Sequence, residues 1–205
     1  IFLLISATVS RAELVIEITR GADDALPIAV MPFSGTQAAD NLGTIIKADL
    51  ERSGKFRALS DSQLTVSGTP VDYARWQGSG TNHLVTGSST PTADGRFEIR
   101  YELFSLDRKI RLLGEALTVP ASQWRDAAHF AADKIFEAIT GARGVFSTKI
   151  IYVNQYPHNG KFRYRLELAD ADGHRPLSIL DSPEPILSPG WSPDGRMVTY
   201  VSFES

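Results

Sequence analysis

The pattern of the chain changes after Gly141, and this change limits the possible folds more than any other feature. Before Gly141, short apolar runs typical of strands are interspersed with two segments in which apolar residues recur at helical spacing. After it, only short strand-like runs remain, joined by turns that contain glycine. The pattern predicts an α/β domain over residues 25–144, followed by an all-β unit over residues 145–205.

Both helices of the α/β domain are expected to be amphipathic. The first covers residues 38–52, and the second starts near Pro120 and Ser122 and ends at Gly141. Their apolar stripes consist of Leu42, Ile45, Ile46 and Leu50 in the first helix and of Trp124, Ala128, Ala131, Ile135 and Ile139 in the second. The stripes predict that both helices pack on a sheet.

The strands of this domain are expected to form a mixed sheet. Residues 28–31 form an unbroken apolar run, which is typical of a central strand buried on both faces. Further strands are expected at residues 56–59 and 84–87. Apolar and charged residues alternate over residues 97–103, which indicates a half-exposed strand, and residues 112–119 are expected to pair with it as a hairpin.

The all-β unit has the spacing of a propeller blade. Short strands are expected at residues 150–153, 164–169 and 177–180, and a further strand at 197–203. Three strands, a turn and the start of a fourth match the rhythm of roughly 40 residues that propeller blades show. We therefore expect residues 145–205 to be the first blade of an incomplete propeller and the start of the next. One blade cannot close a ring, so apolar faces and strand edges should be exposed.

A turn motif precedes the last expected strand. In it proline presets φ, aspartate bonds the backbone and glycine accepts a positive φ. Its residues are Trp191, Ser192, Pro193, Asp194 and Gly195. We expect the tryptophan to pack between blades and the other four residues to shape a β-turn.

The first residues resemble the end of a secretory signal peptide. An apolar run at residues 1–5 is followed by small residues, and Ser10 and Ala12 occupy the −3 and −1 places of a small-x-small cleavage site. Cleavage would remove residues 1–12, leave Glu13 as the N-terminus and place the product in the periplasm. The alternative is a buried strand running into residues 14–16. The sequence contains no run of about 18–20 apolar residues, so we expect no direct membrane insertion.

Composition argues against several function classes. The net charge of −3 provides no basic field of the kind that binds nucleic acid. The chain has no cysteine, which removes disulfides and thiolate chemistry. No phosphate-binding or dinucleotide motif occurs. We therefore expect no cofactor.

Candidate catalytic and metal patterns also favour structural roles. The four histidines are scattered, and His129, in the second helix, is interpreted as a partly buried or surface residue rather than a ligand. Asp170 and Asp172 resemble half a calcium loop, but the later ligands are missing and a hairpin turn is expected. Ser192 lies in a Gly-x-Ser-x-Asp context, which lacks the second glycine of a nucleophile elbow. We expect no metal site and no enzyme activity.

The ordered motifs resemble the TolB family of periplasmic propeller proteins of the Tol–Pal system. The residues that carry the resemblance are Pro-Ile-Ala-Val-Met-Pro-Phe at 27–33, Ser-Gly-Lys-Phe at 53–56, the helix end at 138–141 with the following 143–148, Asp-Ala-Asp-Gly at 170–173 and Ser-Pro-Asp-Gly at 192–195 with 200–205. The likeness extends from residue 13 to residue 205.

The resemblance implies a protein-binding role. It implies that TolA binds the N-terminal segment, that Pal binds the propeller largely beyond Ser205, and that other outer-membrane proteins are further partners. The segment consists of Glu13, Leu14, Val15, Ile16, Glu17, Ile18, Thr19, Arg20, Gly21, Ala22, Asp23 and Asp24. An extended apolar segment can add to the edge of a partner's sheet, although it could equally be an edge strand of its own domain. The resemblance also implies roles in outer-membrane integrity and cell division.

Two other readings remain open on the sequence alone. Propellers with the same turn motif also precede the catalytic domain of prolyl-oligopeptidase-like hydrolases. An envelope assembly factor could share only the α/β domain. The residues after Ser205 would distinguish a TolB-like protein from these two alternatives.

Overall fold

The structure is a computed structural model of the chain, and it describes residues 25–64 and 70–203. The predicted signal segment at residues 1–12 and the predicted binding segment at residues 13–24 therefore lie outside the described residues.

The α/β domain is built on a mixed sheet with the strand order β3-β1-β4-β5-β6. Strand β1 runs parallel to β3 and β4, and β2 pairs in parallel with β4. Strands β4, β5 and β6 are antiparallel neighbours. The bounds are β1 (Leu26–Val30), β2 (Ser34–Gly35), β3 (Phe56–Ala58), β4 (His83–Pro91), β5 (Phe97–Ser105) and β6 (Ile110–Val119). The predicted mixed sheet is confirmed.

Strand β1 is buried on both faces, as its unbroken apolar run predicts. Ile28 and Ala29 are completely buried. Ile28 packs in the larger core under the two helices, whereas Ala29 belongs to a second cluster with Trp76 and Leu84. The sheet therefore has apolar side chains packed on both sides of its centre.

Helices α1 (Leu42–Arg52) and α2 (Trp124–Thr140) pack on the larger core and against each other. The four apolar residues predicted for the first helix are all buried. Trp124 anchors α2 in an edge-to-face contact with Phe97, at 5.2 Å between ring centres. Gly141 ends the helix with a φ of +73°, as predicted. Short 3₁₀ helices are η1 (Asp61–Gln63), η2 (Tyr73–Trp76) and η3 (Ala121–Gln123).

The first helix begins at residue 42 rather than at the predicted residue 38. Asn41 has an extended backbone, and its side chain accepts a hydrogen bond from the backbone N–H of Gly43. The residue therefore caps the helix, and residues 38–40 are left outside it.

The remaining strands form two antiparallel sheets. Strands β7 (Lys149–His158), β8 (Lys161–Asp170) and β9 (Leu177–Ser182) make a three-stranded sheet, and β10 (Ile186–Trp191) pairs with β11 (Val198–Ser202). Four of these five strands cover the segments predicted as strands. Strand β10 was not predicted, because Ser188, Pro189 and Gly190 are typical turn residues. A register shift between Leu187 and Gly190 accommodates them, with Ser188 at a φ of +50°.

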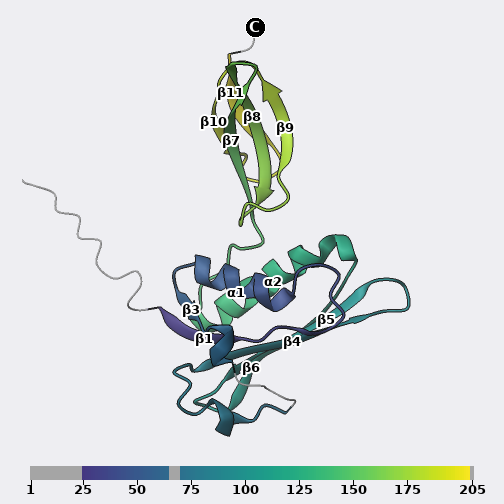
Figure 1. Cartoon of the computed structure of the whole chain (residues 1–205), viewed down its shortest axis with the longest axis vertical. Coiled ribbons are helices and arrows are strands. Elements are labelled where there is room, and N and C mark those ends of the chain that lie inside the picture. The colour runs from purple at the N-terminus through teal and green to yellow at the C-terminus, as the bar shows by residue number, and fades with distance from the viewer. Residues whose placement is uncertain (1–24, 65–69, 204–205) are drawn as a thin grey trace, which may run out of the picture.

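The molecule is layered along its long axis. Figure 1 shows α1 and α2 between the mixed sheet and strands β7 to β11. The outer surface of the helices thus meets the blade rather than only solvent.

Candidate functional site

The predicted binding segment, residues 13–24, precedes the first described residue, Ala25. It leads directly into β1, which lies between β3 and β4 in the sheet. Its role as a binding site stays a prediction.

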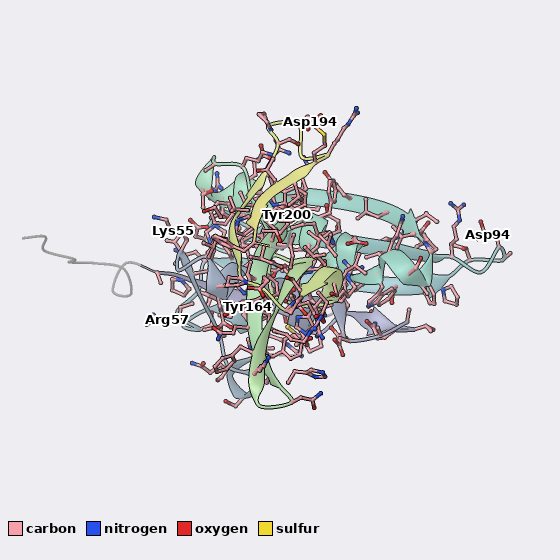
Figure 2. All side chains as sticks on the ribbon, turned by 90° about the horizontal axis from the view of Figure 1, so that it is seen from above. Lys55, Arg57, Asp94, Tyr164, Asp194 and Tyr200 are labelled. Carbon is pink, nitrogen blue, oxygen red and sulfur yellow. The ribbon has the colours of Figure 1, made fainter. Side chains whose placement is uncertain are left out.

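The turn that contains the Ser-Pro-Asp-Gly motif is closed by its own side chains. Ser192 Oγ donates to Asp194 Oδ1 over 2.6 Å, and Asp194 Oδ1 accepts from the backbone N–H of Arg196 over 3.1 Å. The hydroxyl of Ser192 also accepts from the backbone N–H of Met197 over 2.9 Å. Gly195 has a φ of +68°. Figure 2 shows Asp194 at the tip of the loop between β10 and β11.

Ser192 therefore serves the turn in this structure. A strand, β11, follows it instead of the helix that a nucleophile elbow requires. This geometry agrees with the interpretation of Ser192 as a turn residue rather than a nucleophile.

The blade strands carry exposed apolar side chains, which agrees with the expectation of uncovered faces. The large apolar residues exposed in β7 to β11 and their connections are Ile150, Phe162, Leu177, Ile179, Leu187, Trp191, Met197, Tyr200 and Val201, together with Phe203 just after β11. Exposure of so many large apolar side chains fits a unit whose sheets pack against neighbouring blades. Trp191 is 38% exposed, and its packing between blades stays a prediction.

The glutamates of β5 are paired on the surface. Arg100 Nε lies 2.6 Å from Glu98 Oε1, and Arg111 Nη1 lies 2.7 Å from Glu102 Oε1. These carboxylates form ion pairs on a charged face rather than a catalytic pair.

A buried charged cluster lies where the helices meet the blade. Among the described residues, Asp49, His129 and Asp172 bring potential ligand atoms within 4.8 Å of one another. His129 is only 2% exposed, so its interpretation as a partly buried or surface residue is wrong. Asp172 lies in the predicted turn, which Gly173 closes by donating its N–H to the carbonyl of Asp170 over 2.8 Å.

Two blade carboxylates at this place, Asp170 and Asp172, are stabilised in the charged form. Burial alone would raise the pKa of Asp170, but hydrogen bonds from Arg175 and Lys149 outweigh burial and lower it. Burial likewise opposes the charged form of Asp172, and the N–H of His174 with the charge of Arg125 lowers the pKa of this carboxyl.

These donors already occupy the oxygens that a metal ion would need. Arg125 Nη2 hydrogen-bonds Asp172 Oδ2, and Arg175 Nε lies 2.7 Å from Asp170 Oδ2. A divalent cation would have to displace positively charged side chains, so the donor set fits ion pairing better than metal binding.

The sequence does not predict this cluster, because its members are far apart along the chain. Each of them is a residue type that also occurs without a functional role in a helix or a turn.

No described helix combines the length and apolar character that would let it span a membrane.

Comparison with known proteins places the chain in a family. The family described as the TolB amino-terminal domain matches residues 14–112, and the TolB beta propeller domain matches residues 136–205. The Tol-Pal system protein TolB of Alcanivorax borkumensis is 45% identical over 199 residues, which cover 95% of this chain and 46% of that protein. The protein of the same name from Thioalkalivibrio sulfidiphilus is 40% identical over 96% of this chain and 47% of its own length.

A solved structure agrees with the sequence comparison. The crystal structure of TolB from Acinetobacter baumannii has a TM-score of 0.81 and 40% identity, and it covers 92% of this chain and 47% of that one. The chain thus spans about half the length of the relatives it matches. The two matched domains, their order and the agreement of the folds show that the chain belongs to the TolB family.

Proposed function

We propose that this chain is a non-catalytic, periplasmic protein-binding component of the Tol–Pal system. In this proposal TolA binds residues 13–24, and Pal binds the propeller to which strands β7 to β11 contribute. Other outer-membrane proteins are further partners. The protein would thereby support outer-membrane integrity and constriction during cell division. A signal peptide would direct export and would be cleaved after Ala12.

The observation that carries the proposal is the similarity along nearly the whole chain to proteins named Tol-Pal system protein TolB. In the chain, residues 13–24 immediately precede Ala25 and strand β1. In the proposal this segment binds the partner, and the α/β domain carries it.

The chemistry of residues 13–24 supports binding by strand addition. Main-chain hydrogen bonds would supply affinity, and alternate side chains would supply specificity. In an extended conformation Leu14, Ile16 and Ile18 would share one face, and Val15 and Glu17 the other. We assign the first face to the partner.

Deletion of residues 13–24 from the full-length protein tests the TolA assignment. We expect the deletion to abolish binding to immobilised TolA while leaving the circular dichroism spectrum and Pal binding unchanged, because the described strands and helices all follow the segment in the chain. Unchanged TolA affinity would refute the assignment.

A matched pair of variants tests the assigned face. We expect substitution of Leu14, Ile16 and Ile18 by serine to weaken TolA binding by more than about tenfold, or about 1.4 kcal/mol. The control carries Val15→Ser and Glu17→Gln on the opposite face and should bind nearly as well as the unmodified protein. Equal loss in both variants would contradict the assigned face.

A further inference from the structure

The contact between the α/β domain and the blade is polar. Among the described residues, neither apolar core of the α/β domain includes a side chain from β7 to β11. The two units are instead joined by the linker and by the junction cluster, which we define as Asp49, Arg125, Asp126, His129, Lys149, Asp170, Asp172 and Arg175. Domains joined by a small polar interface move relative to one another unless specific contacts hold them.

Charges of both signs cross the junction in both directions. Arg125 of α2 hydrogen-bonds Asp172 of the blade. In return, Arg175 of the blade hydrogen-bonds Asp126 of α2, with one nitrogen–oxygen distance of 3.3 Å. Pairs in both directions restrict the rotation of the blade relative to α2 as well as the distance between them. The reason is that each guanidinium group is planar and donates hydrogen bonds in fixed directions.

The centre of the cluster is excluded from solvent. The side chains of Asp170 and Asp172 are 2% and 3% exposed, and that of Arg125 is 14% exposed. Loss of one partner would leave a buried charge uncompensated, which is far more costly than loss of a surface ion pair. The pairs should therefore form and break together.

His129 links both helices to this centre. Its Nδ1 lies 2.6 Å from Asp49 Oδ2 of α1, within hydrogen-bonding distance. Its Nε2 lies 3.7 Å from Asp172 Oδ2 and 3.9 Å from Asp170 Oδ2 and has no hydrogen-bond partner in the described structure. The ring is thus fixed on one side to α1 and faces the carboxylates of the blade on the other.

We propose that the junction cluster is a latch that sets the orientation of the α/β domain on the first blade. Closed, it holds the two units at one angle. When the contacts of Asp172 are broken, the two units can move relative to each other, because neither apolar core of the α/β domain includes a side chain from β7 to β11.

Distance measurement between the two units tests the latch in the full-length protein. This chain has no cysteine, so spin labels can be attached to cysteines introduced at Arg57 in β3 and Lys161 in β8, both exposed. We expect a single narrow distance distribution for the unmodified latch. Asp172→Asn should make the distribution about twofold wider, because a polar junction without its anchor allows relative motion.

Asp181→Asn is the matched control. Asp181 also pairs with two arginines, Arg163 and Arg165, but it lies within the blade sheet. This control should leave the distribution unchanged. A distribution that is as narrow in Asp172→Asn as in the unmodified protein, with both variants folded, would overturn the proposal.

If Asp172→Asn does not fold, a second variant, Arg125→Gln, tests the same contact. Arg125→Gln removes the partner of Asp172 and should widen the distribution to a similar extent. An unchanged distribution in Arg125→Gln overturns the proposal independently. Dialysis against EDTA should have no effect on the unmodified protein, and widening by EDTA would show that a metal ion, rather than the ion pairs, holds the junction.

Discussion

Gly43 shows how closely α1 approaches the end of β1. A Cβ atom at this position would lie 2.3 Å from the backbone oxygen of Met31. A nonbonded Cβ and oxygen do not approach this closely in proteins. A backbone oxygen also cannot move away easily, unlike the end of a flexible side chain. The helix therefore needs glycine in its first turn.

We expect Gly43→Ala to lower the free energy of unfolding by about 1–3 kcal/mol, because the added methyl group must displace either α1 or the chain after β1. Urea denaturation of the full-length protein measures this change. Thr44→Ala is the control: Thr44 is the next residue and is exposed, so its variant should differ by less than about 0.5 kcal/mol. Equal stability of the two variants would show that the helix can shift without cost.

Asn41 explains why the start of this helix was predicted too early. Its side chain bonds the backbone N–H of Gly43, and it also bonds both the N–H and the carbonyl of Phe33 over 2.9 Å. The contacts with Phe33 depend on how two distant segments meet. Apolar spacing identified the helix and its buried face, but it could not identify this competing set of bonds.

Among the elements, the linker between α2 and β7 is held mainly by one side chain. Asp133 of α2 accepts from the backbone N–H of Phe146 over 2.6 Å and from that of Ser147 over 3.1 Å. It also accepts from the hydroxyl of Ser147. Phe146 packs edge-to-face on Phe136 of the same helix. The linker is thus fastened to α2 before the blade begins.

We expect Asp133→Asn to loosen the linker, because the amide replaces one acceptor oxygen by a donor. The local cost should be about 1–3 kcal/mol, the range for a buried group left unpaired. Cleavage by trypsin after the exposed Arg143 should become faster, since cleavage follows local opening.

Glu137→Gln provides the comparison for this experiment. Glu137 pairs with Lys134 on the exposed side of α2 at 3.7 Å, a contact worth little. Its cleavage rate should match that of the unmodified protein. If Asp133→Asn also matched it, the packing of Phe146 rather than Asp133 would hold the linker.

As with the start of α1, local patterns predicted most of the strands, whereas features that depend on contacts between distant segments were missed. Alternation and apolar runs predicted the sheet of the α/β domain and four of the blade strands. Strand β10 was missed because Ser188 and Pro189 are locally turn-forming, and only pairing with β11 makes them part of a strand. Pairing across the register shift is not visible in the residues of one strand.

At the scale of the whole molecule, the sequence predicts the order of the domains but not the junction between them. Each sequence motif predicts the structure of one helix, strand or turn. The junction cluster instead combines Asp49 of α1, His129 of α2 and Asp172 of the turn after β8. The predicted binding segment at residues 13–24 rests on resemblance, and the described residues leave it a prediction. The turn around Asp170 was predicted, and its bonds to α2 were not.

Acid should weaken the junction. Hydrogen bonding from Arg175 lowers the pKa of Asp126, and the pKa values of Asp170 and Asp172 are also lowered. A carboxyl whose pKa is lower in the folded state stabilises that state above its unfolded pKa of about 3.9 and loses this contribution as the pH falls through the folded pKa. The groups that face these carboxyls are Asp49, Arg125, His129, Lys149, His174 and Arg175.

We therefore expect the distance distribution between Arg57 and Lys161 to widen as the pH falls below about 4. Circular dichroism at each pH separates this change from unfolding of either domain. A distribution that stays narrow down to the pH of global unfolding would show that the carboxylates do not hold the junction.

The position of α1 and α2 between sheet and blade limits how the α/β domain can be reused. In a free-standing domain the outer side of such helices could be redesigned with almost any polar residue. Here Asp49 and His129 lie on that side and are sealed by the blade. If the α/β domain were grafted onto another protein, the side chains of Asp49 and His129 would become exposed to solvent, because the blade that covers them would be absent. The domain is therefore a poor interchangeable module unless this helical face is rebuilt with it.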